Sequence, residues 1–299
     1  MFDTDAQIQT QTLTFENEGA TLAATLYLPA DFDGMPRPGV VVTGAWTTVQ
    51  DQMPRTYAIE LASRGFAALT FDFRGWGQSG DLPNGVRFKE DPVAKISDIK
   101  AAIAFAASLP EIAADDLNGL GICASAGYMV DATTGNDAIR KVGLVAPWLQ
   151  NEDIVNAVYG GAEGVAGLIE MGRAAGASGG QIIPAAGPEG ADGVLMPIGG
   201  YYYEADRGAI PAYDNKWNTA SWEGWLTYFP ADHAPAFDKP LHIVHSDAAA
   251  IPDGARAFVA GTPAPVGETW IDDVIQFDFY DQPEHVTTAT DAVAAHFSK

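Results

Sequence analysis

The sequence predicts an α/β protein with a mostly parallel central sheet flanked by helices. Short, continuous apolar runs such as PGVVVTGAW (38–46) suit strands that are buried on both faces. Segments with helical spacing of apolar residues separate these runs, and this alternation indicates βαβ units. The chain has 299 residues, of which 47% are hydrophobic and 18% charged. It is therefore long enough to bury a large core.

The expected elements follow in chain order. TLAATLYLPAD (21–31) alternates apolar and polar residues before a proline, which favours an early antiparallel strand. The other expected strands lie at 38–46, from 66, at 117–123, at 142–148, at 240–246 and at 268–272. The expected helices lie at 52–64, around Ile96 to Ala106, near 253–260 and from about 283.

The segment 149–230 interrupts this rhythm, because it is rich in glycine between 160 and 200 and in aromatic residues after 201. We predict an α/β core formed by 1–148 and 231–299, and a lid formed by 149–230. A lid of this kind would lie over the carboxyl edge of the sheet, where open α/β sheets bind ligands.

Charge and composition exclude several functions. The 39 acidic residues against 16 Lys and Arg give a formal charge of −23, which disfavours nucleic acid and membrane surfaces as partners. The single cysteine, Cys123, excludes internal disulfides, and no His, Asp or Glu grouping has metal-ligand spacing. No signal peptide and no stretch of about 20 apolar residues is evident. The sequence predicts a cytoplasmic protein without a cofactor, whose partner is a small-molecule substrate, and leaves open whether it forms a homodimer.

The stretch NGLGICASAGY (118–128) carries the clearest chemical signal. Its small-x-nucleophile-x-small pattern is typical of a sharp strand-to-helix turn that presents a nucleophile. We favour Cys123 as this nucleophile, with Ser125 as the alternative register and an inert buried cysteine as a third reading. The amide of Ala124 would then face a developing oxyanion. A dinucleotide fingerprint, GLGICA (119–124), is disfavoured because it follows several strands instead of opening the domain.

With these motifs the chain resembles the α/β-hydrolase superfamily, and more narrowly its bacterial dienelactone-hydrolase-like members with a G-x-C-x-S elbow. The resemblance covers nearly the whole chain and rests on VVVTGAW, FDFRGWGQSG, GICASAG, APW and FDFYDQP. It implies that the second oxyanion amide comes from Ala45 or Trp46, and we assign it to Ala45. It also implies Asp247 as the acid and a histidine after the last strand as the base.

The expected base position departs from the family pattern, because Gln276 stands about where that histidine should be. We assign the base to His285, nine residues further on, and keep His245 as the alternative. Trp46, Trp148 and Tyr202 are expected to line an apolar pocket. Elsewhere, Asp72 and Arg74 should fix the loop after their strand. Lys95 and Asp98 should lie on a solvated helix face.

Two functions follow. The first is a hydrolase that cleaves an ester, thioester or lactone of a small, fairly apolar substrate through an acyl-enzyme on Cys123. The second is a non-hydrolytic protein of the same fold, such as a lyase, an isomerase or a small-molecule binder with a degenerate triad. A base within hydrogen-bond reach of the thiol would favour the first, and Gln276 alone beside it would favour the second.

Overall fold

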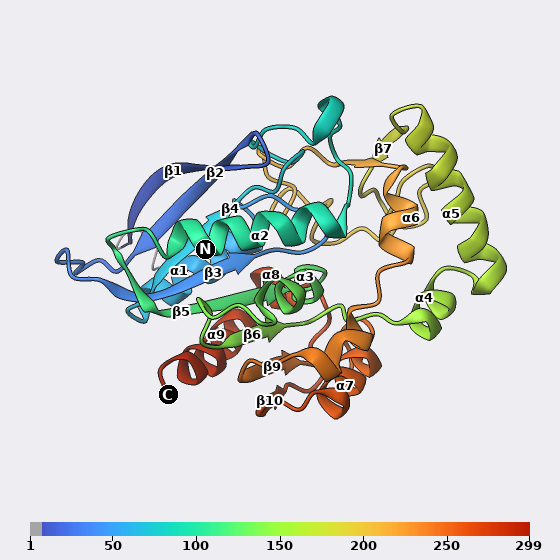
Figure 1. Cartoon of the computed structure of the whole chain (residues 1–299). Helices are drawn as coiled ribbons and strands as arrows, with labels where there is room; N and C mark the ends of the chain where they lie inside the picture. Colours follow the sequence, from blue (N-terminus) through green and yellow to red (C-terminus); the bar gives the residue numbers. More distant parts are fainter. Residues whose placement is uncertain (1–7) are drawn as a thin grey trace.

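The computed structural model describes residues 8–299, which form an eight-stranded sheet (Figure 1). Its strands are β1 (Gln9–Asn17), β2 (Ala20–Leu28), β3 (Arg37–Thr43), β4 (Ala67–Phe71), β5 (Ile112–Ile122), β6 (Val142–Val145), β9 (Leu241–His245) and β10 (Val266–Trp270). The order across the sheet is β1-β2-β4-β3-β5-β6-β9-β10. β1, β2 and β4 pair antiparallel, and all pairs from β4 to β10 are parallel. The predicted fold class is confirmed.

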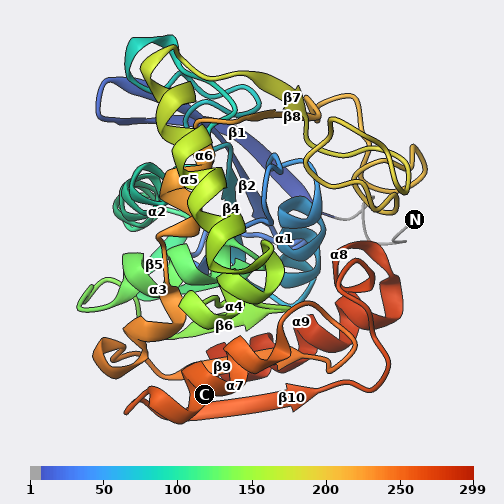
Figure 2. The ribbon, with the colours of Figure 1, turned by 90° about the vertical axis from the view of Figure 1, so that its right-hand side faces the viewer.

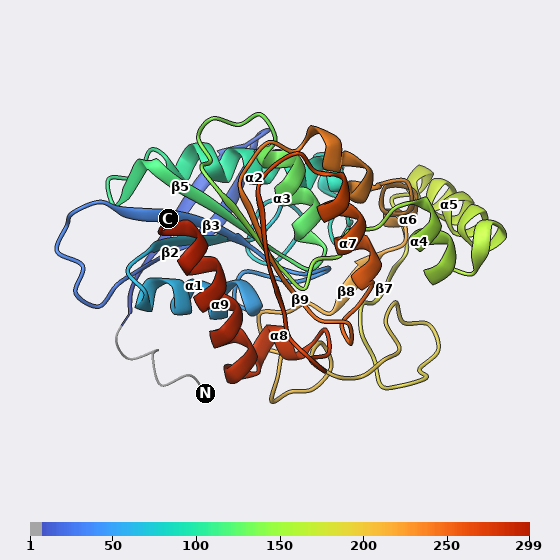
Figure 3. The ribbon, with the colours of Figure 1, turned by 90° about the horizontal axis from the view of Figure 1, so that it is seen from below.

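Helices cover both faces of the sheet. The main ones are α1 (Met53–Ser63), α2 (Pro92–Ala106), α3 (Ser125–Thr133), α7 (Pro252–Gly261) and α9 (Pro283–Phe297). α1 and α9 pack together on one face, and α2 and α3 pack together on the other (Figure 3). A short helix, α8 (Asp278–Asp281), precedes α9, and a single 3-10 turn, η2 (Pro83–Gly85), precedes α2. β4 and β6 are wholly buried, as are the carboxyl-terminal parts of β3 and β5, which explains why these stretches are continuous and apolar in sequence. The amino-terminal half of β5 is partly exposed, so the strand begins at Ile112, before the expected 117.

The first strand escaped the sequence analysis. β1 has the sequence QTQTLTFEN and pairs only with β2 at the edge of the sheet. Its outward positions are polar because one side faces solvent, so the apolar signal is weak. The strand expected at 142–148 ends at Val145, since Ala146 already has a left-handed backbone.

The segment 149–230 forms an insertion at the carboxyl end of the strands (Figure 1). It contains α4 (Glu152–Val158), α5 (Gly161–Ala177), β7 (Ile182–Pro184), β8 (Lys216–Asn218) and α6 (Ser221–Leu226), and η3 (Pro230–Ala236) leads back to the core. A long loop without regular structure joins β7 to β8 (Figure 2). Most of α5 is exposed, whereas α6 buries Trp222, Trp225 and Leu226.

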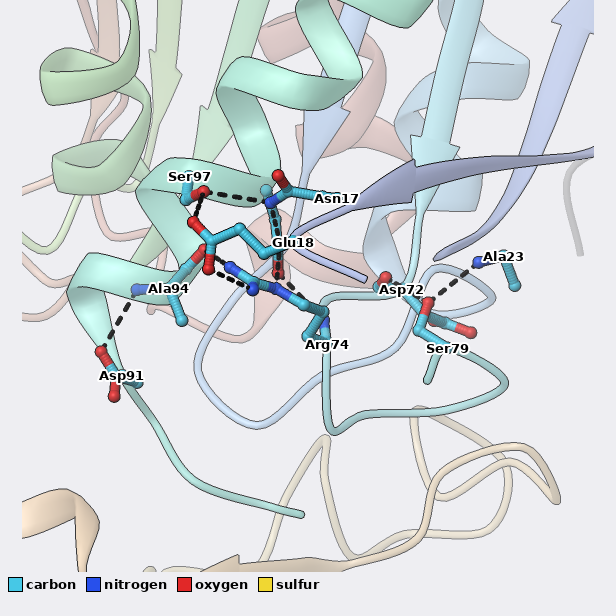
Figure 4. Close-up of polar contacts among 10 residues, drawn as sticks. Asn17, Glu18, Ala23, Asp72, Arg74, Ser79, Asp91, Ala94 and Ser97 are labelled. Atoms are coloured by element: carbon cyan, nitrogen blue, oxygen red, sulfur yellow. Dashed lines mark hydrogen bonds and ion pairs between the residues drawn. The ribbon is translucent and has the colours of Figure 1, made fainter. Parts of the chain in front are cut away.

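The charged residues of α2 correct one expectation. Lys95 and Asp98 were predicted on a solvated face, but both are buried. Asp98 accepts hydrogen bonds from Arg74 Nε (2.6 Å) and from Asn17 (2.8 Å). Arg74 also pairs with Glu18, so the loop after β4 is tied to the β1–β2 turn and to α2 (Figure 4). As expected, this ion-pair network fixes the loop.

Left-handed residues other than glycine follow the parallel strands that end near the insertion. Thr47 (φ 64°) lies after β3, Cys123 (φ 55°) after β5 and Ala146 (φ 43°) after β6. Ile251 (φ 43°) lies after β9, and Asp273 (φ 57°) after β10. Such backbones cost free energy in residues with a Cβ and cluster at functional sites. This edge of the sheet is therefore the place to look for chemistry.

Candidate active site

Cys123 occupies the tight turn between β5 and α3. Its backbone is left-handed, and α3 begins two residues later at Ser125. A Cβ on Gly121 would lie 2.8 Å from Ala126 Cα, so the chain passes there only without a side chain. Ser125 is fully buried, and its hydroxyl has no hydrogen-bond partner. The strained position of this turn is thus Cys123, and Ser125 is the first residue of the helix.

Backbone amides approach the sulfur from two sides. The amides of Ala124 and Trp46 both interact with the Cys123 sulfur and favour its thiolate. The amide of Ala45 is instead directed to Met53 Sδ at 3.5 Å. Of the two residues that the resemblance offered for the second oxyanion amide, Trp46 presents its amide to the sulfur, whereas Ala45, to which we assigned that role, directs its amide away from it. Backbone amides beside a nucleophile are the kind of donor from which an oxyanion hole is built.

The remaining neighbours of the sulfur are neutral. Burial raises the pKa of the Cys123 thiol, while the Tyr280 hydroxyl and Gln276 act in the opposite direction. Gln276 is fixed on both sides of its carboxamide: Oε1 accepts a hydrogen bond from the Ala250 amide (3.0 Å), and Nε2 donates to the Ala146 carbonyl (2.9 Å) and to the Tyr280 hydroxyl (2.9 Å). The thiol is thus held in its neutral form beside a tyrosine and an amide.

The predicted base is not at this site. His285 lies in the first turn of α9, is half-buried and does not line the cavity around Cys123. His245 is fully buried at the end of β9, where its ring packs on Trp270 (centroids 5.4 Å apart) and neither ring nitrogen has a hydrogen-bond partner. Burial lowers the pKa of His245 to about 4. Neither histidine lines the cavity that Cys123 opens into, whereas Tyr280 of α8 does.

The predicted acid also points elsewhere. The side chain of Asp247 is 75% exposed and pairs with Arg256 at 2.7 Å. The guanidinium of Arg256 in turn lies 3.8 Å from the centre of the Trp270 ring. From the same loop, Ala248 and Ala250 face the cavity instead. The expected arrangement of Cys123, His285 and Asp247 is therefore not assembled.

Cys123 opens into an apolar cavity of about 660 Å³, a size that suits a small organic ligand. The three predicted pocket residues, Trp46, Trp148 and Tyr202, all line it. The other lining residues are Ala124, Val158, Tyr159, Leu195, Met196, Pro197, Ile198, Trp222, Trp225, Ala248, Ala250, Ile275, Gln276, Phe277 and Tyr280. Half of the cavity wall comes from the insertion. No charged side chain and no histidine belongs to the wall that the described residues form.

A buried ion pair supports the loop that carries Trp46. Glu90 pairs with Lys95 at 2.7 Å, and both side chains are almost fully buried. Glu90 also accepts hydrogen bonds from the Tyr128 hydroxyl (2.8 Å) and from the Thr47 amide (3.4 Å). Its own amide donates to Ser221 of the insertion (2.8 Å). Glu90 thus links three parts of the molecule: the loop with Trp46 and Thr47 (hereafter the oxyanion loop), α3 and the insertion.

The insertion touches the oxyanion loop a second time. The hydroxyls of Thr47 and Tyr213 are 3.0 Å apart. The ring of Trp46 stacks on Trp225 of α6, with centroids 4.9 Å apart. The position of the Trp46 amide therefore depends on the insertion as well as on the core.

Sequence reasoning missed Tyr280 and Glu90. Tyr280 had a readable signal, since it lies four residues after Gln276 and such pairs face the same way in a helical turn. Glu90 had none, because its partners come from segments far apart in the chain.

Comparisons with known proteins agree with this architecture. No protein-family model matches the chain. It is 34% identical to the uncharacterised protein PA2218 of Pseudomonas aeruginosa over 142 residues, which is 47% of this chain and 38% of that protein. It is 31% identical to the uncharacterised protein YcjY of Escherichia coli over 131 residues (44% and 42% of the two chains). It is 29% identical to a thiohydrolase of Eupenicillium brefeldianum over 130 residues (44% and 40%). The matches span about two fifths of the length of these curated relatives.

Solved structures show the same fold over the whole chain. The crystal structure of PA2218 has a TM-score of 0.83 at 23% identity and covers 99% of this chain and 95% of its own. An α/β hydrolase, GrgF, from Penicillium sp. sh18 has a TM-score of 0.75 at 16% identity (97% and 100%). Est1E from Butyrivibrio proteoclasticus with bound ferulic acid has a TM-score of 0.63 at 18% identity (96% and 100%). The chain therefore has the α/β-hydrolase fold, which these neighbours share.

The described residues show two further absences. No helix among residues 8–299 has both the length and the apolar content to cross a bilayer. Within the same range, no group of three or more His, Cys, Asp or Glu side chains could hold a metal ion.

Proposed function

We propose that this protein is a carboxylic-ester hydrolase that acts on an ester, thioester or lactone of a small, neutral, apolar substrate through an acyl-enzyme on Cys123. The observation that carries the proposal is the place of Cys123 at the strained turn between β5 and α3, in the wall of an apolar cavity that Ala124 and Trp46 also line. The amides of these two residues favour the thiolate of Cys123. Donors placed there stabilise the oxyanion that forms when a nucleophile attacks a carbonyl. The hydrolase names of the structural neighbours and of the thiohydrolase relative support the same class.

The substrate class follows from the cavity. Its wall is aromatic and aliphatic, its polar groups are hydroxyls, indole N–H groups and one carboxamide, and it carries no charge. A charged substrate would lose its hydration there without gaining a partner. The insertion supplies much of this wall, so we propose that it acts as a lid over the substrate.

A second function is favoured by one specific observation. The groups beside the thiol are Gln276 and Tyr280, and no histidine lines the cavity in the described part of the chain. A non-hydrolytic protein that keeps the pocket, such as a lyase, an isomerase or a small-molecule binder, needs no triad.

One experiment separates these functions by using the single thiol. Activity on short p-nitrophenyl esters and simple lactones is measured before and after iodoacetamide treatment, with intact mass spectrometry to count the alkyl groups. We expect one alkylation to abolish activity, Cys123→Ala to be inactive and Ser125→Ala to stay active. Activity that survives complete alkylation would move the nucleophile to Ser125. Absence of any acyl adduct or turnover would favour the non-hydrolytic function.

A further inference from the structure

The two halves of the reaction that an acyl-cysteine undergoes make different demands on the site. Attack of Cys123 on a carbonyl needs an oxyanion hole, and the amides of Ala124 and Trp46, which line the same cavity as the sulfur, are the donors at hand. Release of the acyl group by water needs a base that removes a proton from the water. The wall of the cavity offers hydroxyls, indoles and the carboxamide of Gln276, none of which is a base at neutral pH. The site is therefore equipped for acyl capture and poorly equipped for hydrolysis.

The missing base decides which acceptor reacts. Water has a pKa of about 15.7 and is not ionised without help. A thiol is already a few per cent thiolate at neutral pH and is intrinsically very nucleophilic. Base catalysis contributes about 10²- to 10⁴-fold in enzymes that have it. Without a base, the reaction of a thiol acceptor slows little, whereas the reaction of water loses the full 10²- to 10⁴-fold acceleration.

The lack of a base in the described cavity wall also determines which acyl donor can react, a thioester or an oxygen ester. Cys123 must lose its proton as it attacks. Tyr280 lines the same cavity, and its hydroxyl, which accepts a hydrogen bond from Gln276 (2.9 Å), lies beside the sulfur. Burial and the neighbouring Cys123 raise the pKa of Tyr280 well above its ordinary value. The hydroxyl therefore remains protonated and can only relay a proton. A departing thiolate accepts a relayed proton readily and leaves without strong acid catalysis, whereas an alkoxide does not.

We propose that Cys123 transfers an acyl group from a neutral thioester to a neutral thiol, faster than it delivers that group to water. In the first step the C–Sγ bond to Cys123 forms and the bond from the carbonyl carbon to the donor sulfur breaks. The Sγ proton passes to the Tyr280 hydroxyl, which gives its own proton to the departing sulfur. In the second step the acceptor sulfur bonds to the carbonyl carbon and the C–Sγ bond breaks. The proton of the acceptor thiol passes to the Tyr280 hydroxyl, which gives its own proton to Sγ. The inference rests on the proposed acyl-enzyme at Cys123 and replaces water by a thiol as the preferred acceptor.

The cavity indicates that both thiols are neutral. No charged side chain is among the described residues of its wall, and the chain carries a formal charge of −23 that repels anions. Three wall residues, Val158, Ile198 and Ile275, are also among the large apolar residues most exposed to solvent. They come from α4, the β7–β8 loop and the segment after β10, and they give the cavity an apolar rim. An uncharged thiol with an apolar body can enter over such a rim without losing ionic hydration.

The test uses an acyl thioester of N-acetylcysteamine as donor and 2-mercaptoethanol as acceptor, with the full chain. Intact mass spectrometry follows the acyl adduct on Cys123, and the release of N-acetylcysteamine gives the rate. We expect one equivalent to be released quickly, followed by slow turnover in water. We expect the added thiol to raise turnover by roughly 100-fold. The Cys123→Ala variant with the same thioester donor and thiol acceptor measures the direct exchange in solution, and this rate is subtracted.

Two further measurements test the donor and the proton relay. The ethyl ester of the same acid should give no adduct on the timescale of the thioester. Tyr280→Phe, which keeps the ring and removes the hydroxyl, should slow adduct formation while the thiol still reacts with iodoacetamide. Alkylation of this variant shows that the cavity is intact, and loss of both reactions would mean that the variant is misfolded.

The outcomes separate the inference from the proposed function. An adduct that water removes as fast as the thiol does would overturn acyl transfer and leave the hydrolase intact. Equal acylation by the ethyl ester would overturn the requirement for a thioester. If neither donor acylates Cys123 in the folded protein, the proposed function fails, and the inference fails with it.

Discussion

The two sides of Cys123 differ in how they are built. On the oxyanion side, the Trp46 loop is held by Glu90, by Tyr213 and by stacking on Trp225. On the opposite side, Gln276 and Tyr280 stand beside the sulfur, and Asp247 faces solvent. One side presents backbone amides, and the described cavity wall on the other presents a carboxamide and a phenol instead of a histidine or a carboxylate. The comparison shows that carbonyl binding and proton transfer are separable parts of such a site.

The largest expected effect is a loss of folding stability when the buried ion pair that supports the Trp46 loop is broken. Glu90→Gln removes the charge opposite Lys95, which is buried over the rings of Phe73 and Trp76. An uncompensated buried charge costs about 3 to 5 kcal/mol. We expect urea denaturation to show a loss of this size in the free energy of unfolding.

The matched control is Asp247→Asn, which breaks the exposed pair with Arg256. Exposed pairs contribute at most about 1 kcal/mol, so this variant should unfold almost like the parent. Equal stabilities for Glu90→Gln and Asp247→Asn would show that the buried pair does not hold the loop.

The next effect comes from supplying the proton-transfer side with a base. Gln276→His places an imidazole beside the thiol, and we expect water to release the acyl group at least about 10-fold faster. Because the pKa of the parent thiol is raised, its alkylation by iodoacetamide should keep increasing with pH beyond the ordinary value of 9.0. In the Gln276→His variant, the pH at which the alkylation rate levels off should be lower, since an imidazolium favours the thiolate and so lowers the pKa of the thiol.

Gln276→Met is the control, because it removes the carboxamide and adds no base. Faster hydrolysis in both variants would show that the glutamine merely blocks water, and the contrast between the two sides would then need revision.

The smallest effect tests the link between the insertion and the oxyanion loop. Tyr213→Phe removes the contact with the Thr47 hydroxyl, which should lower stability by about 1 kcal/mol. Because Thr47 adjoins Trp46, adduct formation at Cys123 should also slow several-fold. Tyr203→Phe, on a ring that is 48% exposed, should change neither quantity. The rate of adduct formation and the urea midpoint are the two readouts. An unchanged rate of adduct formation would show that the loop with Trp46 and Thr47 keeps its shape without this contact to the insertion.

The sequence predicted the parts of this molecule that local patterns determine. Buried parallel strands read as apolar runs, and the small residues around Cys123 marked the strand-to-helix turn. Periodicity also placed Lys95 and Asp98 on a helix, but it could not show that Glu90 and Arg74 meet them from other segments. Polar residues of a helix face solvent by default, and only tertiary structure supplies a buried partner.

The proton-transfer side was harder to predict because it depends on loop geometry. His285 was chosen for its type and its nearness in sequence to the expected position. The short helix α8 intervenes and places Tyr280 at the sulfur instead. Whether Ala45 or Trp46 supplies an amide depends on how one loop bends, and the left-handed Thr47 is part of that bend. Residue types in a sequence therefore indicate the chemistry of a site more reliably than its geometry.

The left-handed residues at the strand ends have a consequence for thermal tolerance. Thr47, Cys123, Ala146, Ile251 and Asp273 each hold a backbone conformation that is strained for a residue with a Cβ, at a cost on the order of 1 kcal/mol apiece. Glycine at these points would relieve the strain but would let the loops that follow the strands move relative to the cavity. Stabilising substitutions that preserve function are thus to be sought in the outer helices and the edge strand, and the rim is where a more heat-resistant variant would lose its acyl-binding geometry first.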